Sequence, residues 1–133
     1  MSYLLDTHYI LWTMFEPEKI NKRIRAILED ENSIKYVSGI CLWEISLKYS
    51  IGKLTLEGTD PYELYTTIKT SGFELLEVET DLLASYHTLP KKEKHTDPFD
   101  RMLIWQAIRK NLILITNDTK IHRYKEDGLT IVS

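Results

Sequence analysis

Four acidic residues that lie far apart in the sequence could come together in the fold and hold a cation: Asp6, Glu44, Asp100 and Asp118. Asp6 directly follows the apolar run 3–5, and Asp118 comes just after the apolar run 112–115, so both stand where buried strands are expected to end. Ligands of open parallel sheets bind outside the carboxyl ends of the strands. We therefore expect Asp6 and Asp118 to face each other at that edge, although Asp is also a favoured helix N-cap.

The other two acids are expected on helices. Asp100 and Glu44 stand in the first turns of predicted helices, where the helix dipole favours negative charge. Glu44 lies in an apolar run, and a buried carboxylate without a partner is costly, so a cation could satisfy it. Asp97 lies one helical turn before Asp100 and could either share the site or only cap the helix. The residues alone leave this choice open.

Clustered carboxylates favour Mg²⁺ or Mn²⁺, because these hard cations prefer oxygen ligands. The histidines show no spacing typical of zinc ligands, and the single cysteine, Cys41, lies in an apolar run where a small buried hydrophobe is expected. A hard cation can lower the pKa of bound water, place it in line with a phosphodiester and offset charge on the leaving oxygen. The residues thus predict phosphate chemistry.

The size and charge of the chain limit the functions to consider. Its 133 residues fit one domain, residues 1–133. The net charge of −3 argues against a broad basic face for nucleic acid, although an acidic site becomes much less acidic when it is loaded with cations. The first residues contain no basic region and no long apolar stretch, which predicts neither a signal peptide nor a membrane span. We therefore expect a cytoplasmic protein.

Short apolar runs alternate with segments of helical period, which predicts an α/β layer fold. The strands are expected at residues 3–5, 34–37, 73–78, 112–115 and, at an edge of the sheet, 129–132. Helices are expected at residues 7–15, 17–29, 42–50, 61–71 and 80–86, and the longest one begins at Asp97-Pro98. A polar, basic loop at residues 90–96 precedes this last helix.

Five segments form a recognisable series: LLDTH at 4–8, WEI at 43–45, GKL at 52–54, HTDPFDRMLI at 95–104 and LITND at 114–118. In this order they resemble PIN-domain proteins and, more narrowly, the VapC-type toxins of bacterial toxin–antitoxin pairs. The resemblance runs through essentially the whole chain, and the stretch at 95–104 is its most specific part. Trp105 departs from the pattern, since such sequences commonly have a small residue at this position.

The resemblance implies a three-layer α/β/α sandwich with a central, mainly parallel sheet, and Mg²⁺- or Mn²⁺-dependent cleavage of RNA. The family's four acids, which bind the metal and catalyse the reaction, correspond to Asp6, Glu44, Asp100 and Asp118. The resemblance selects Asp100 over Asp97 as the third acid and places Thr116 at the edge of the site. It also implies two partners, a second copy of the chain in a homodimer and a small antitoxin.

Several basic and aromatic residues could contact RNA. Arg101 could bind a phosphate or hold a carboxylate with its bidentate fork, and Lys48 could contact substrate or pair with Glu44 one turn earlier. The lysines of the basic loop could touch phosphates or simply be solvated: Lys91, Lys92 and Lys94. The tryptophans are more typical of a core than of base-stacking platforms: Trp12, Trp43 and Trp105.

Two other functions fit parts of the pattern. A non-catalytic PIN-fold module could bind RNA or a protein while its acids serve as helix caps. A phosphoryl-transfer receiver domain also has Mg²⁺ at acidic strand ends, but it needs an Asp at the end of a mid-chain strand, where this chain offers only Glu77 and Glu79. The favoured function is a metal-dependent endoribonuclease toxin.

Overall fold

The chain folds around a sheet of five parallel strands in the order β3-β2-β1-β4-β5. The computed structural model describes all 133 residues. The strands are β1 (Ser2–Leu5), β2 (Ile34–Ser38), β3 (Glu74–Leu76), β4 (Ile113–Ile115) and β5 (Thr130–Val132). The α-helices are α1 (Thr7–Phe15), α2 (Lys22–Glu29), α3 (Gly39–Ser50), α4 (Pro61–Lys69), α5 (Thr80–Ser85) and α6 (Pro98–Lys110). The 3₁₀ helices are η1 (Pro17–Lys19), η2 (Tyr86–Thr88) and η3 (Ile121–Asp127).

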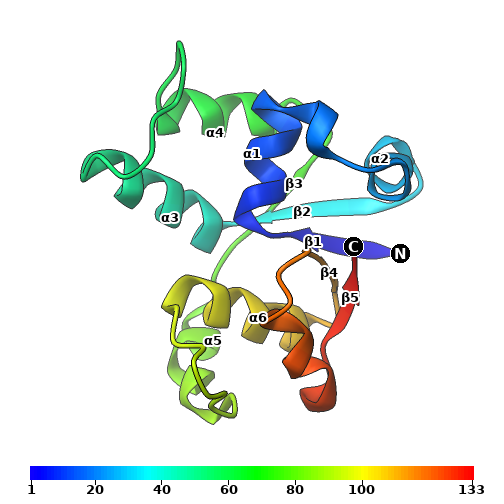
Figure 1. Ribbon diagram of the computed structural model, residues 1–133, viewed down its shortest axis with the longest axis vertical. Coiled ribbons are helices and arrows are strands. Elements are labelled where there is room, and N and C mark those ends of the chain that lie inside the picture. Colours follow the sequence, from blue (N-terminus) through cyan, green and yellow to red (C-terminus); the bar gives the residue numbers. More distant parts are fainter.

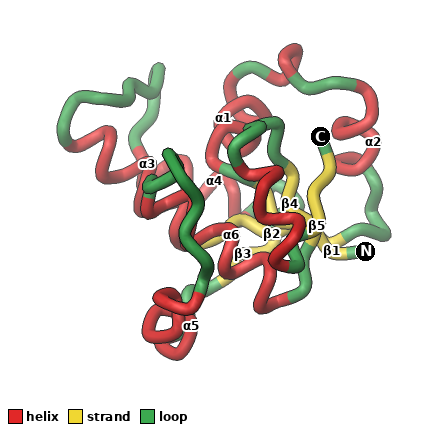
Figure 2. The backbone as a smooth tube through the Cα atoms, turned by 60° about the horizontal axis from the view of Figure 1, so that its bottom comes forward, coloured by secondary structure: helices red, strands yellow, loops and turns green.

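Helices cover both faces of the sheet and give three layers. In Figure 1, α1, α2 and α4 lie on one side of the strands, and α5 and α6 lie on the other. Figure 2 shows the strands enclosed between the helices. The helix α3 begins where β2 ends and contacts both α4 and α6. The expected α/β/α sandwich with a parallel sheet is therefore confirmed.

No helix combines the length and the apolar character that crossing a membrane requires.

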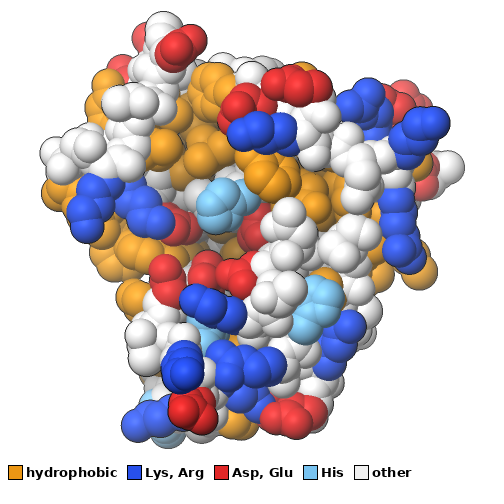
Figure 3. Space-filling view, viewed as in Figure 1, with side chains coloured by type: hydrophobic (Ala, Val, Ile, Leu, Met, Phe, Trp, Pro, Cys, Tyr) orange, Lys and Arg blue, Asp and Glu red, His pale blue; other side chains and the backbone are white.

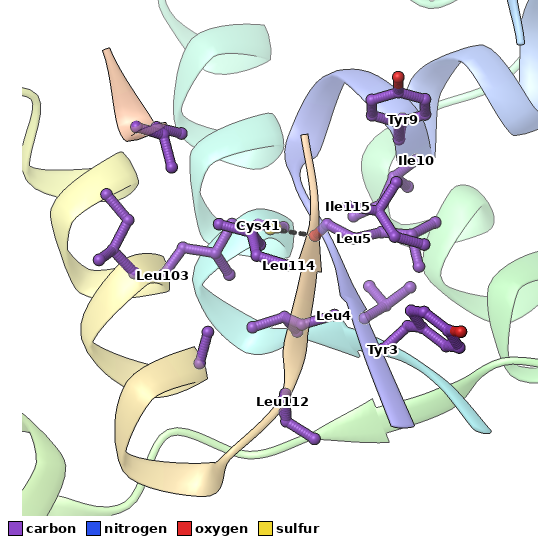
Figure 4. Packing of buried hydrophobic residues seen from close by; sticks show 14 of the residues in the cluster. Tyr3, Leu4, Leu5, Tyr9, Ile10, Cys41, Leu103, Leu112, Leu114 and Ile115 are labelled. Carbon is purple, nitrogen blue, oxygen red and sulfur yellow. Dashed lines mark hydrogen bonds between the residues drawn. The ribbon is translucent and has the colours of Figure 1, made fainter. Parts of the chain in front are cut away.

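The core is built around β1 and β4, whose side chains are shielded on both faces. Leu4 and Leu5 of β1 and Leu114 and Ile115 of β4 are fully buried, as expected for a parallel sheet covered by helices. Figure 4 shows these side chains packed against residues of the surrounding helices. The Cys41 thiol of α3 is also buried and donates to the Leu5 carbonyl at 3.7 Å. The small buried hydrophobe expected at this position is confirmed.

The strand order creates a crevice at the carboxyl ends of β1 and β4. After β1 the chain winds outwards through β2 and β3 on one side, whereas β4 and β5 lie on the other side. The direction of winding changes between β1 and β4, and such switch points open ligand-binding crevices. Leu5 pairs with Ile115, and the Asp6 N–H donates to the Ile115 carbonyl at 3.1 Å. This register places Asp6 beside Thr116 at the mouth of the crevice.

Two helices start at positions that the sequence analysis did not predict. Residues 17–29 form two helices instead of one, because the Asn21 side chain caps α2 by accepting from the Ile24 N–H at 2.9 Å. The helix α3 begins at Gly39, before the expected residue 42, because the Ser38 hydroxyl oxygen caps it.

The tryptophans do not all belong to the core. Trp12 and Trp105 pack against the main hydrophobic cluster as expected. Trp43 is 59% exposed, so its expected place in the core is wrong. The reason is its position on α3, where it follows the buried Cys41 by two residues and so projects from a different side of the helix.

Shortening a core side chain on β4 is expected to destabilise the fold. Leu114→Ala removes a fully buried side chain and should lower the free energy of unfolding by about 2–5 kcal/mol in urea denaturation. Leu47→Ala changes an exposed position of α3 and should alter this free energy by less than about 1 kcal/mol. Equal losses in the two variants would contradict a core centred on β4.

Candidate metal centre

Asp6 ends β1 and begins α1. Its Oδ1 accepts from the Tyr9 N–H at 3.0 Å, which caps the helix. The residue is only 5% exposed. Burial raises the pKa of the Asp6 carboxyl, and hydrogen bonds from Thr116 and from the Tyr9 N–H oppose this only in part. Because an ionised carboxylate has about four acceptor positions, capping leaves Asp6 able to accept further contacts in the crevice.

Thr116 and Asp118 lie just beyond the end of β4, next to Asp6. Thr116 is fully buried, and its Oγ1 accepts from the Asp118 N–H at 3.2 Å. Asp118 Oδ1 accepts from the Lys120 N–H at 2.9 Å. The negative charge of Asp118 also acts on Asp6. The two acids that follow strands therefore lie within electrostatic reach of each other, at the edge where the sequence analysis expected them.

Glu44 reaches the crevice from the second turn of α3. It is 6% exposed, yet both of its oxygens have partners. The Thr7 hydroxyl donates to Oε1 at 2.6 Å, and the Lys48 ammonium donates to Oε2 at 2.5 Å. The pairing with Lys48 one turn later is thus formed. The argument that Glu44 would be left unpaired without a cation is wrong, because Thr7 and Lys48 satisfy its carboxylate.

The first turn of α6 brings Asp97 and Asp100 to the same place. Asp97 Oδ1 accepts from the Phe99 N–H at 2.9 Å and from the Asp100 N–H at 3.1 Å, so Asp97 caps this helix. Asp100 has no capping contact, and its side chain is 31% exposed. The capping role expected for Asp97 is confirmed, and Asp100 is the acid of this pair that serves no helix end.

The acids of the crevice act together on Asp100. Burial, and after it the charges of four neighbouring carboxylates, raise the pKa of the Asp100 carboxyl to about 7: those of Asp97, Glu44, Asp118 and Asp6. Figure 3 shows acidic side chains around a hollow in the middle of this face, with Lys and Arg side chains on both sides of it. The fold therefore gathers all four acids expected from the sequence, with Asp97 beside them.

The donor set of this crevice fits a hard divalent cation. As the side chains stand, no group of three or more His, Cys, Asp and Glu residues is arranged to hold a metal ion. The groups that converge are nevertheless carboxylates, whose oxygens Mg²⁺ and Mn²⁺ prefer. Burial and, after it, repulsion by the other carboxylates raise the pKa of Asp100, and a cation would relieve that repulsion.

Arg101 is not placed to contact RNA. It is 7% exposed. Its guanidinium donates to two hydroxyls and two carbonyls, those of Tyr86, Tyr124, Leu89 and Pro90. Its guanidinium therefore holds no carboxylate, and its donors are taken up by groups within the fold instead of being directed at the crevice.

His95 and Tyr124 also adjoin the site, and the sequence analysis missed both. His95 is 4% exposed, with Nδ1 2.8 Å from the Tyr124 hydroxyl and Nε2 3.5 Å from Asp100 Oδ2. Burial lowers the pKa of His95. The one signal in the sequence was the position of His95 at the start of the motif that contains Asp100. Tyr124 carried no comparable signal.

A cleft of about 210 Å³ lies beside the carboxylates, between α1 and α3. Its lining includes Thr7, His8, Lys48 and Lys53. On the other side of the site, the basic loop is partly neutralised, because Lys92 pairs with Glu126 and Asp127. Lys91 and Lys94 are exposed. Contact of these lysines with phosphates stays a prediction.

Comparison with known proteins gives one family and several similar folds. A family model described as PIN domain matches residues 3–127. VapBC2 from Rickettsia felis, bound to a DNA fragment from its promoter, gives a TM-score of 0.71 at 20% identity, over 99% of this chain and 98% of that one. VapBC-1 from nontypeable Haemophilus influenzae gives a TM-score of 0.66 at 23% sequence identity, over 100% of this chain and 98% of that chain. FitAcB from Neisseria gonorrhoeae gives a TM-score of 0.65 at 23% sequence identity, over 98% of this chain and 96% of that chain. No curated protein matches the chain.

The raised pKa of Asp100, caused by burial and by the neighbouring charges, predicts that stability depends on pH. Because the pKa of this carboxyl rises from 3.8 to about 7 on folding, the folded state favours the protonated acid, and ionisation weakens the fold as the pH rises from about 4 to about 7. Asp100→Asn cannot ionise. In metal-free buffer, calorimetry should show the Tm of the variant rising relative to wild type over this range and levelling off above it. A Tm difference that stays constant with pH would contradict the raised pKa of Asp100.

Proposed function

The chain belongs to the PIN domain family, and on that premise we propose that it is a metal-dependent endoribonuclease, the toxin of a toxin–antitoxin pair. The observation that carries the proposal is the convergence of carboxylates from separate elements on Asp100. The choice of RNA as substrate is supported by the resemblance of segments 4–8 and 95–104 to VapC-type toxins.

Four carboxylates would hold Mg²⁺ or Mn²⁺: those of Asp6, Glu44, Asp100 and Asp118. When bound, the cation supplies activation of a water for attack on the phosphodiester and offsets charge on the leaving oxygen. Asp97 stands beside this set, and its capping contacts fix the start of α6 and so the place of Asp100.

The chain's own residues prepare these carboxylates. Thr7 and Lys48 hold the two oxygens of Glu44 in one orientation. Burial and the neighbouring carboxylates raise the pKa of Asp100 to about 7, and a cation bound here would favour its ionised form. The Lys48 side chain is 40% exposed, so its ammonium can also meet a phosphate that enters the cleft between α1 and α3.

Removing the Asp6 carboxylate is expected to stop RNA cleavage. Asp6→Ala should slow the cleavage of a labelled single-stranded RNA in Mg²⁺ by about 100-fold or more, because a ligand of the metal is lost. Asp60→Ala is a matched control, since Asp60 caps α4 by accepting from the Glu63 N–H at 2.9 Å and lies on a helix away from the crevice. Each variant loses a helix cap worth about 1 kcal/mol, but only Asp6→Ala should lose activity.

The same experiment separates the two candidate functions. If Asp6→Ala cleaved RNA as fast as wild type, the nuclease proposal would be wrong. The alternative, a non-catalytic PIN-fold module that binds RNA or a protein, would then be favoured, with Asp6 acting only as a cap.

We further propose that the chain forms a homodimer, pairs with a small antitoxin and acts in the cytoplasm. The homodimer is supported by an apolar surface where α3, α5 and α6 meet. There Trp43 and Leu83 are 59% and 49% exposed, and the Trp43 ring packs edge-on against Phe99 with centroids 5.1 Å apart. Contiguous exposed apolar side chains are typical of protein interfaces. The antitoxin is supported by the resemblance to VapC-type toxins.

Replacing Trp43 is expected to weaken the homodimer. Trp43→Ser removes the largest exposed apolar side chain of this surface and should shift the protein toward monomer in light scattering coupled to size exclusion. Tyr62→Ser removes an aromatic side chain that is 73% exposed on α4 and should leave the molar mass unchanged. A wild-type monomer, or a Trp43→Ser protein that remains dimeric, would contradict this interface.

A further inference from the structure

A buried chain of polar groups leads from Arg101 to Asp100 through Tyr124 and His95. Arg101 Nη1 donates to the Tyr124 hydroxyl at 2.8 Å. The same hydroxyl lies 2.8 Å from His95 Nδ1, and His95 Nε2 lies 3.5 Å from Asp100 Oδ2. Tyr124 is 0% exposed and His95 is 4% exposed, so bulk water does not compete for these contacts. The chain ends on one of the carboxylates of the site.

The positions of the protons in this chain follow from the first donor. A guanidinium can only donate, so the Tyr124 oxygen accepts from Arg101 and its own proton needs a different acceptor. The one other group bonded to this hydroxyl is Nδ1 of His95, which therefore accepts. A ring nitrogen that accepts a hydrogen bond carries no proton, so the ring has a single proton. That proton is then on Nε2, the nitrogen directed at Asp100.

We propose that His95 is a positioning residue for Asp100, aimed by Tyr124 and Arg101 so that its Nε2–H orients the Asp100 carboxylate. The proposal rests on the proposed function, because the orientation of Asp100 matters in this way only if Asp100 binds the metal. At 3.5 Å the contact is long for a hydrogen bond, and a small inward movement of the carboxylate would complete it. The positive charge of Arg101 polarises the chain and strengthens the final donor.

Anchoring of the basic loop does not require this contact. Arg101 donates to the Leu89 and Pro90 carbonyls at 3.0 and 3.1 Å, which fixes the start of the loop. Arg123 donates to the Glu93 carbonyl at 2.6 Å, which fixes its middle. Because the backbone of the loop is held by these bonds, the imidazole of His95 is not needed for that purpose and can serve Asp100.

The tautomer of His95 gives a direct test that needs neither metal nor RNA. Nitrogen-15 NMR of the full chain distinguishes which ring nitrogen carries the proton. At a pH well above 6.5, the ordinary pKa of histidine, we expect His95 to carry it on Nε2 in wild type. In Tyr124→Phe, which lacks the hydroxyl proton, the preference for Nε2–H should weaken. A proton on Nδ1 in wild type would overturn the proposal.

Affinity for Mn²⁺ tests the consequence for Asp100. Tyr124→Phe should weaken Mn²⁺ binding by about tenfold, measured by electron paramagnetic resonance without RNA. Tyr86→Phe is the matched control, since the Tyr86 hydroxyl also accepts from Arg101, at 2.9 Å, but has no contact with His95. Both variants remove one acceptor from Arg101, but only Tyr124→Phe also removes the hydroxyl that contacts His95. Only Tyr124→Phe should therefore lose Mn²⁺ affinity. Equal affinities in the two variants would overturn the positioning role.

Substitutions of His95 itself distinguish the role of its N–H donor from the role of its side-chain volume. His95→Gln keeps an N–H that can reach Asp100, whereas His95→Leu fills a similar space without a donor. We expect His95→Gln to retain more Mn²⁺ affinity than His95→Leu, and to retain more of kcat with little difference in KM. Equal losses would assign His95 to packing alone.

Failure of this proposal and failure of the proposed function give different results. If wild type binds Mn²⁺ and cleaves RNA, but the Tyr124 and Tyr86 variants match in affinity, only the positioning role is overturned. If wild type binds no Mn²⁺ and cleaves no RNA, the proposed function is overturned, and the positioning role is overturned with it.

Discussion

The pairing of β1 with β4 is the contact on which the site depends. It joins two strands that are far apart in the sequence, and the register of Leu5 with Ile115 sets the level at which Asp6 and Thr116 leave the sheet. A slip of one residue would turn each side chain of the strand to the opposite face and would break its packing against the helices. Packing of that run on both faces therefore fixes the register, and the register places the acids. The helices α3 and α6 then supply Glu44 and Asp100.

The same crevice that gathers the carboxylates opposes the stability of the fold. Like charges in a partly dry environment raise one another's free energy. The protein offsets this cost in a different way at each acidic residue. Glu44 pairs with Lys48, the Tyr9 N–H offsets part of the cost of burying Asp6, and Asp100 keeps the raised pKa that burial and the neighbouring charges cause. Functional sites commonly retain such unfavourable terms, which the surrounding core must offset.

Much of the fold and part of the site could be predicted from the sequence, for reasons that differ between residues. Asp6 and Asp118 follow short continuous apolar runs, which are typical of buried strands and visible in one sequence. The sequence alone could not decide between Asp97 and Asp100, because both stand at the start of one helix. Only the resemblance to a family made that choice. Arg101 was misjudged because a charged residue on a helix is expected at the surface. Its partners come from segments before and after the helix, and no local pattern reveals them.

The double use of Asp6, as cap of α1 and as an acid of the crevice, has an evolutionary consequence. Asn is as good an N-cap as Asp, and the codons of the two residues differ by a single nucleotide. One mutation can therefore remove the negative charge while the helix, the sheet edge and the outer surfaces keep their form. A lineage can lose the chemistry in one step without losing the fold, so catalytic and non-catalytic descendants of such a protein lie next to each other in sequence space.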